Sequence, residues 1–276
     1  MRLKIYGCRG SVPLSHHVDK VFGGNTSCIK LTSGDYSIAL DAGSGLINLG
    51  IDIENSSSKI PKMRQDILLS HLHMDHIIGL SAFAPALDAE RGIRIFTVSR
   101  DERSLPNQIF GAFVPPYWPV SLGEIVYAEC VQIHEEVPFA AGSLTITAFS
   151  ANHPDKTTSF HITDGEKTVV YLLDSEIAAL GNDEYAKLLG YCKDADAVVF
   201  DAAYSVKDYV NFKGWGHSTV EDGIRLRRDA DCKRMIFSHF AQKYNDGEIL
   251  SWRRLYANSP DASCYILAAD EMEIIL

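Results

Sequence analysis

The sequence predicts an α/β (α+β) fold of four layers, an αββα sandwich in which two sheets face each other between two layers of helices. Three observations support this prediction. Short runs typical of strands fill most of the first half of the chain, and the second half alternates strands with helices. The length of 276 residues suits one large domain or two small ones. No repeat, low-complexity tract or linker divides the chain, so we expect a single domain over residues 1–276.

Strands are expected where a short apolar or alternating run stands between turn-forming residues. Ser33, Gly34 and Asp35 predict a hairpin turn before one such run, and the glycines of 41–45 predict a tight turn after it. The strands expected in this part of the chain are 3–6, 29–31, 36–40, 65–70 and 93–98.

The later part of the chain adds helices between its strands. Asp164 and Gly165 predict the turn of a second strand pair. Helices are expected over 178–191, from residue 219 with Ser218 or Thr219 as N-cap, and over 246–257. The strands expected here are 129–133, 144–149, 160–163, 168–173, 197–200, 233–237, 263–267 and 272–276.

Residues 99–123 show no regular pattern. Pro115 and Pro116, with Tyr117 and Trp118 beside them, argue against a regular helix or a central strand. A substrate lid and a packed connection explain this segment equally well.

Composition restricts the classes of partner and the compartment. The net charge is −10 and no dense cluster of Lys and Arg is present, so a long nucleic acid should be repelled. The six cysteines are scattered without a Cys-x-x-Cys pair, which predicts reduced thiols. The N-terminus reaches Gly7 too early for a signal peptide, and no apolar run is long enough for a membrane span. We therefore expect a cytoplasmic protein without a membrane partner.

The strongest chemical signal is the segment from His71 to His76, which reads His-Leu-His-Met-Asp-His. It lies between a predicted buried strand and residues 77–84, which predict the start of a helix. His71 and His73 alternate with a leucine, so both imidazoles can point to one side, while Asp75 and His76 can serve a second ion. Such ligands suit zinc, manganese or iron. A histidine-rich surface loop is the alternative, but four ligand-type residues in six positions favour a metal site.

Three further ligand-type residues stand just past predicted strands. They are His153, Asp174 and His239. Loops at strand ends can bring such residues to the same rim as His71. Each one alone is more often structural than a ligand, because single residues match a motif by chance.

The pattern His-x-His-x-Asp-His after an apolar strand resembles the signature of the metallo-β-lactamase superfamily, whose members are αββα hydrolases with one or two metal ions. The resemblance implies a metallo-β-lactamase-like sandwich and two divalent ions, with zinc as first choice and manganese or iron as alternatives. It also implies a metal-bridging hydroxide as nucleophile, since two ions can lower the pKa of a shared water to about 7. The implied ligands are His71, His73 and His153 for one ion, Asp75, His76 and His239 for the other, and Asp174 for both.

Asp201 ends a predicted strand, and His217 directly precedes a predicted helix. From the local sequence alone, a helix cap beside a stray histidine is the favoured interpretation. The segment 213–219, Lys-Gly-Trp-Gly-His-Ser-Thr, nevertheless resembles the phosphodiesterase branch of the superfamily, which includes tRNA 3′-processing endonucleases and cyclic-nucleotide phosphodiesterases. The resemblance implies that Asp201 orients His217, which protonates the leaving oxygen.

We expect two further roles from the residues themselves. Asp75 would orient the hydroxide as well as bind metal, and Ser218 and Thr219 at a helix N-terminus would bind the phosphate of the substrate. Together with 213–219, segments 7–13 and 22–28 resemble a bacterial group of this branch described as metal-dependent hydrolases. The resemblance covers essentially the whole chain.

The basic, glycine-rich arm with which the tRNA enzymes grip tRNA has no counterpart in this acidic sequence. We therefore expect a binuclear metal-dependent hydrolase that cleaves a small phosphodiester, such as a cyclic nucleotide. Two alternatives stay open: a hydrolase of a carbonyl substrate such as a lactone or thioester, and a non-catalytic nucleotide-binding regulator. A homodimer is compatible with the resemblance.

Overall fold

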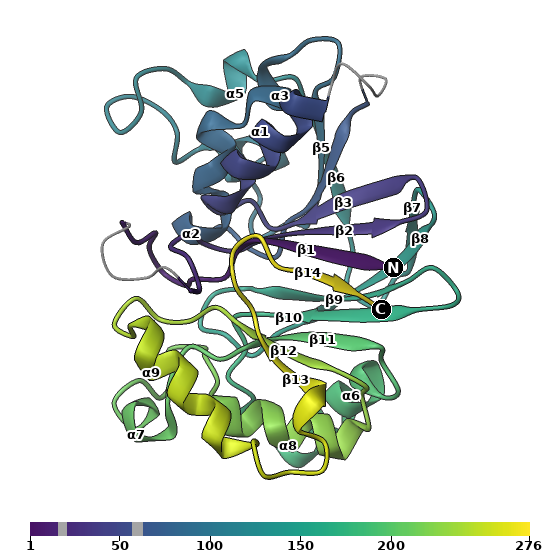
Figure 1. The fold of residues 1–276 in the computed structure, drawn as a ribbon. Helices are drawn as coiled ribbons and strands as arrows, with labels where there is room; N and C mark the ends of the chain where they lie inside the picture. The colour runs from purple at the N-terminus through teal and green to yellow at the C-terminus, as the bar shows by residue number, and fades with distance from the viewer. Residues whose placement is uncertain (16–20, 57–62) are drawn as a thin grey trace.

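The computed structural model describes residues 1–15, 21–56 and 63–276. Two seven-stranded sheets face each other in the middle of the molecule, and helices cover the outer face of each sheet (Figure 1). The predicted αββα sandwich is therefore confirmed.

The first sheet joins an antiparallel half to a parallel half. In sheet order its strands are β14 (Glu273–Ile275), β1 (Arg2–Gly7), β2 (Cys28–Ser33), β3 (Tyr36–Leu40), β4 (Gln65–Leu68), β5 (Ile93–Val98) and β6 (Ala128–Ile133). Pairing is antiparallel from β14 to β3 and parallel from β3 to β6. The predicted hairpin is present, because Ser33 pairs with Tyr36 across Gly34, whose φ is +56°.

The second sheet repeats this arrangement. In sheet order its strands are β13 (Tyr265–Leu267), β12 (Met235–Ser238), β11 (Ala197–Asp201), β10 (Thr168–Leu172), β9 (Thr158–Thr163), β8 (Leu144–Ser150) and β7 (Phe139–Ala141). Pairing is parallel from β13 to β10 and antiparallel from β10 to β7. Every predicted strand is found, and the short β7 is an additional one.

The helices lie outside the two sheets, with α1, α3 and α5 over the first sheet and α6, α8 and α9 under the second (Figure 1). Their bounds are α1 (Gly45–Ser56), α2 (Met74–Ile77), α3 (Ala84–Leu87), α4 (Leu105–Phe110), α5 (Leu122–Ile125), α6 (Asn182–Cys192), α7 (Val206–Tyr209), α8 (Val220–Ala230) and α9 (Asp246–Ser251). The predicted cap of α8 is confirmed for Thr219, whose Oγ1 accepts a hydrogen bond from the Asp222 N–H at 3.2 Å.

Helix α1 is the largest element that the sequence analysis missed. It contains Gly45 and Gly50, and glycine has a low helix propensity, so the sequence did not indicate a helix here. Gly50 faces Phe83 so closely that a Cβ would lie 3.0 Å from the ring. Glycine at this position therefore allows α1 to pack closely against Phe83, although glycine stabilises a helix less than other residues do.

Two other expectations need adjustment. The helix expected after residue 77 is broken into α2, a 3-10 turn over Ile78–Ala82, and α3. Residues 99–123 contain α4 and α5, and Ile109, Phe110 and Phe113 are buried under the first sheet's helices. This burial supports the packed connection rather than the lid.

A large hydrophobic core lies between the two sheets. It includes Leu3, Ile5 and Leu31 from the first sheet and Val169 and Tyr171 from the second, whose Tyr171 hydroxyl reaches Asp41 of the first sheet. No helix within the described ranges is long and apolar enough to cross a membrane.

Candidate metal centre

All seven predicted ligands lie just past the C-terminal ends of strands, five of them in loops and Asp75 and His76 in the short helix α2. The segment from His71 to His76 follows β4, His153 follows β8, Asp174 follows β10, and His239 follows β12. Both sheets thus contribute residues to one edge of the sandwich. There the ligand atoms form several groups of three that lie within 4.8 Å of one another.

The first turn of α2 places Asp75 and His76 next to His239. Asp75 Oδ2 lies 3.3 Å from His76 Nε2 and 3.2 Å from His239 Nε2, and these two nitrogens are 3.2 Å apart. Asp75 Oδ2 also accepts a hydrogen bond of 2.7 Å from the N–H of Ser11. The three side chains that the resemblance assigns to the second ion therefore converge.

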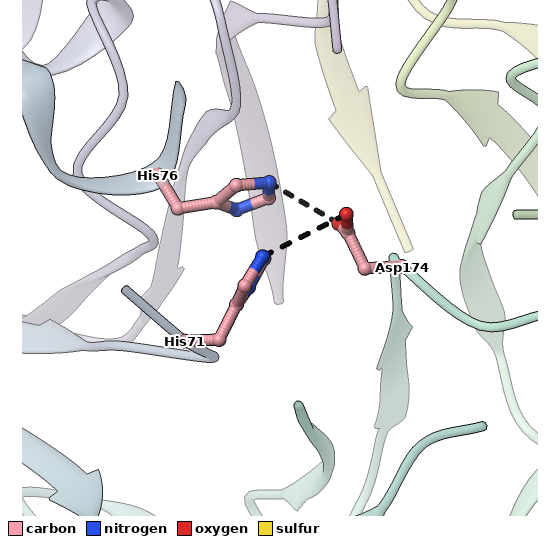
Figure 2. Close-up of side chains that lie close together, drawn as sticks. All are labelled: His71, His76 and Asp174. Carbon is pink, nitrogen blue, oxygen red and sulfur yellow. Dashed lines mark ion pairs between the residues drawn. The ribbon is translucent and has the colours of Figure 1, made fainter. Parts of the chain in front are cut away.

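Asp174 lies in the centre of the cluster with its two oxygens turned to different neighbours. Oδ2 is 3.1 Å from His76 Nε2 and 3.4 Å from His239 Nε2, while Oδ1 is 3.8 Å from His71 Nε2. Figure 2 shows His71 and His76 pointing at this carboxylate from the other side of the centre. This is the placement that a bridging carboxylate requires.

His73 and His153 form the more open side of the cluster. Their ring centroids are 5.1 Å apart, and His71 lies 4.5 Å from the ring of His73 and 5.5 Å from that of His153. His73 Nε2 is 2.7 Å from Asp155 Oδ2, a carboxylate that the sequence analysis did not identify. The three histidines assigned to the first ion therefore also converge, next to an extra acidic group.

The donor atoms suit a divalent metal ion. Nε2 of His71 and Oδ2 of Asp174 are buried without a hydrogen-bond partner, which is costly unless another ligand completes the site. Separations of 3.1 to 3.4 Å around Asp75 and Asp174 suit N and O ligands about 2.1 Å from a shared ion. Burial raises the pKa of Asp174, but His239, His76 and His71 outweigh it and hold that pKa well below its usual range. Asp174 is thus ionised, as a metal ligand must be.

Asp41, directly after β3, orients two of the histidines from behind. Its Oδ2 lies 2.7 Å from His76 Nδ1 and accepts hydrogen bonds of 2.8 Å from both Tyr171 OH and Ser70 Oγ. Ser70 Oγ also lies 3.0 Å from His71 Nδ1. When both Nδ1 atoms donate to this network, both Nε2 lone pairs face the cluster. Asp41 is fully buried and has a φ of +59°.

His217 and Asp201 form the predicted pair beside the cluster. His217 Nδ1 lies 2.9 Å from Asp201 Oδ2, which also accepts from the Ser175 N–H at 3.3 Å. Burial lowers the pKa of His217, but the charge and hydrogen bond of Asp201 outweigh it and raise the pKa to about 9. The imidazole is therefore held in one orientation and kept protonated.

A cavity of about 530 Å³ opens over these groups. Its lining within the described structure includes no lysine, no arginine and no residue of 99–123; it consists of Ser11, His73, Met74, Asp75, His153, Pro154, Asp155, Asp174, Gly214, Trp215, His217 and His239. Five of the seven predicted metal ligands and the predicted proton donor thus line one small-molecule-sized cavity, while His71 and His76 lie behind its wall.

Comparison with known families agrees with this geometry. The profile described as "Beta-lactamase superfamily domain" matches residues 39–240, which include every predicted ligand. The chain belongs to the metallo-β-lactamase superfamily.

Individual members of the superfamily resemble the chain over most of its length. "Probable metallo-hydrolase YhfI" of Bacillus subtilis is 26% identical over 87% of this chain and 86% of its own. "Ribonuclease Z" of Bradyrhizobium diazoefficiens is 22% identical over 70% of this chain and 78% of its own.

Solved structures of the superfamily show the same fold. The crystal structure of YhfI from Bacillus subtilis aligns with a TM-score of 0.71 at 20% identity, over 99% of this chain and 98% of that chain. Zn(2+)-bound PqqB from Methylobacterium extorquens aligns with a TM-score of 0.68 at 16% identity, over all of both chains.

Ser218 and Thr219 do not have the placement expected of phosphate-binding groups at a helix N-terminus. Ser218 is buried, donates to the Ser175 carbonyl at 2.5 Å and accepts from the Ile177 N–H at 3.1 Å. Thr219 is buried as the cap of α8. Neither lines the cavity, so the structure gives both hydroxyls a structural role in place of the predicted substrate contact.

Glu176 fixes the loop before His217, a role that the sequence did not indicate. Its carboxylate accepts hydrogen bonds from the N–H groups of Gly214 at 2.9 Å and Gly216 at 3.1 Å, and from Tyr209 OH at 2.6 Å. In the sequence, Glu176 is noticeable only because it stands two positions after the predicted ligand Asp174. That position gives no indication that its carboxylate binds the loop around Gly214 and Gly216.

Proposed function

We propose that this protein is a binuclear metal-dependent phosphodiesterase that hydrolyses a small phosphodiester. The observation that carries the proposal is the His217–Asp201 pair, 2.9 Å apart, whose imidazole lines the same cavity as five of the seven clustered metal-ligand residues. A phosphodiester needs both parts, because its hydrolysis requires a nucleophile, charge neutralisation and a proton for the leaving alkoxide.

The ligand cluster would hold two divalent ions, with His71, His73 and His153 at one, Asp75, His76 and His239 at the other, and Asp174 at both. When bound, two such ions lower the pKa of a shared water to about 7 and neutralise charge on the phosphoryl group. Zinc suits this set of imidazoles and carboxylates, and manganese and iron are the alternatives. The name of the zinc-bound relative PqqB supports zinc as the first choice.

His217 would act as the general acid. Asp201 takes the hydrogen of Nδ1, so the proton on Nε2 is available to a leaving oxygen. The raised pKa of about 9 keeps this proton on the imidazole at neutral pH. Asp75 would serve both as a metal ligand and as an orienting acceptor, since the Ser11 N–H fixes its Oδ2.

The shape and charge of the site support a small substrate. The cavity holds about 530 Å³, and no lysine or arginine lines it in the described structure. A net charge of −10 also disfavours a long polyanion. We therefore propose a cyclic nucleotide or a similarly small phosphodiester, acted on without a nucleic-acid or membrane partner.

The test is hydrolysis of bis(p-nitrophenyl) phosphate and a panel of cyclic nucleotides by protein reloaded separately with zinc and with manganese. His73→Ala should abolish turnover, whereas His134→Ala, a histidine exposed at the end of β6, should not change it. His217→Ala should slow cyclic nucleotides by about 10²- to 10⁴-fold and p-nitrophenyl esters less, because p-nitrophenolate leaves without a proton. No turnover with two ions bound would refute the proposal and favour a lactone or thioester substrate.

A further inference from the structure

We propose that Trp215 is a stacking platform for a nucleobase, which makes the substrate a nucleoside phosphodiester rather than an alkyl one. This inference rests on the proposed function, because it assumes that the phosphodiester occupies the metal centre. Four observations support it: the exposure of the indole, the fixed loop that presents it, the rings that support it, and the lining of the cavity around it.

Trp215 is 60% exposed and lines the same cavity as five of the predicted metal ligands. Tryptophan offers one of the largest apolar surfaces of any side chain, and leaving it in water gives up the free energy of burial. Trp252 in the same chain is only 6% exposed. A tryptophan kept open beside a reaction centre therefore has the accessibility that a ligand platform needs.

The backbone around Trp215 is fixed rather than loose. Gly214 and Gly216 have φ of +81° and +88°, values that other residues rarely adopt. The N–H groups of both glycines donate to the Glu176 carboxylate at 2.9 and 3.1 Å. Glu176 stands two residues after Asp174, so the same short segment anchors both the centre of the metal cluster and the loop that carries the indole.

Packed rings support the indole from one side. Trp215 meets Phe212 edge to face at 5.2 Å, and Phe212 stacks on Tyr204 at 4.4 Å with the planes 4° apart. Tyr204 in turn meets the ring of His217 at 5.8 Å. This series of rings limits the movement of Trp215 and links its position to that of the proton donor.

The other residues of the cavity suit a planar, uncharged group. Met74, on the first turn of α2, is 45% exposed and lines the same cavity as Trp215. A thioether and an indole give an apolar, polarisable surface for a flat ring. No lysine or arginine lines this cavity in the described structure, so apolar contact with the indole and the thioether is available to add to the affinity that the phosphate supplies.

Binding affinity distinguishes this proposal from a structural role for Trp215. Zinc-loaded protein is titrated calorimetrically with AMP and with ribose 5-phosphate, which carry the same phosphate and sugar but differ in the base. We expect the parent to bind AMP roughly 5- to 100-fold more tightly, as one stacked base allows. Trp215→Ala should abolish the preference by weakening AMP alone, and Trp215→Phe should keep part of it.

The matched control is Tyr117→Ala, which removes an aromatic ring that is 83% exposed and does not line the cavity. It should retain the full preference for AMP. Equal affinity of the parent for the two ligands, no binding of AMP, or an unchanged preference in Trp215→Ala would each overturn the platform. If the platform is overturned but the parent still hydrolyses bis(p-nitrophenyl) phosphate, the phosphodiesterase proposal remains valid without the Trp215 platform. If the parent does not hydrolyse this ester, both the phosphodiesterase proposal and the platform proposal are refuted.

Discussion

Asp41→Asn should weaken metal binding without unfolding the protein. Asp41 has a φ of +59°, a conformation that asparagine tolerates as well as aspartate does. The substitution therefore removes the negative charge behind His76 and adds no backbone strain. Alanine at this position would combine both effects and could not separate them.

The size of the effect follows from the contacts of the carboxylate. Oδ2 faces Ser70 Oγ, His76 Nδ1 and Tyr171 OH, and Oδ1 accepts from the Ser70 N–H at 2.7 Å. The best orientation of an asparagine keeps its oxygen at the Oδ2 position and turns its NH₂ group toward the Ser70 N–H. One charge-assisted hydrogen bond is then lost, at a cost of about 2–3 kcal/mol in the free energy of unfolding. Loss of a carboxylate behind a metal-binding histidine typically lowers metal affinity by about 10- to 100-fold.

The assay is zinc affinity by competition with a chromophoric chelator, combined with urea unfolding of the metal-free proteins. Tyr171→Phe is the matched control, because it removes one donor to Asp41 but leaves the carboxylate and its contact with His76. It should cost about 1 kcal/mol of stability and bind zinc like the parent. The reasoning fails if Asp41→Asn keeps the parent's affinity, or if both variants lose affinity equally.

Three further predictions concern other parts of the molecule. Burial raises the pKa of Asp270 to about 6 against the hydrogen bonds from Asn25, so the folded state holds this proton more tightly than the unfolded chain. The resulting stability is lost as pH rises from about 4 through 6, and Asp270→Asn should gain up to about 3 kcal/mol over the parent at pH 7 and little at pH 4, measured by urea unfolding. Gly216→Ala should lower zinc affinity and turnover more than 10-fold, because the new Cβ would lie 2.0 Å from the His153 ring and must displace it. The φ of +88° at this position adds backbone strain. A crystal structure of the variant in which His153 has not moved would contradict this prediction. Free zinc at 100 times its Kd should add about 2.7 kcal/mol to the unfolding free energy, and a melting temperature unchanged by chelation would exclude such binding.

The sequence was sufficient to predict the strands and the principal ligands because both have strong local signals. Apolar runs such as β11 are buried on both sides and end abruptly at a polar residue. The segment from His71 to His76 concentrates four ligand-type residues in six positions, and His153, Asp174 and His239 each follow an apolar run. The C-terminal ends of strands converge in this fold, so a list of polar residues at strand ends already approximates the site.

The residues that orient the site lacked such a signal. Asp41 and Glu176 are single acids whose importance comes from contacts with distant segments, 35 residues to His76 in the first case and 38 residues to Gly214 in the second. Asp155 is exposed in a loop and contacts His73 across 82 residues. For Ser218 and Thr219 the sequence predicted a substrate contact that the structure does not contain. A hydroxyl at the start of a helix can bind an anion, but it can also cap the helix or bind neighbouring backbone groups. Only the buried position of these two hydroxyls shows that they bind α8 and the adjacent backbone.

The charges around the cluster favour two ions over one. Asp41, Asp75, Asp174 and Asp201 are all at most 6% exposed, and no lysine or arginine lines the cavity in the described structure. One divalent ion would leave these carboxylates in excess, and a phosphodiester anion would be repelled at short range. Two divalent ions would offset the four carboxylates, and a protonated His217 would then supply the positive charge that an anionic substrate meets. Elemental analysis should therefore find two ions per chain in the form that binds AMP, and tight AMP binding by protein with a single ion would contradict this charge argument.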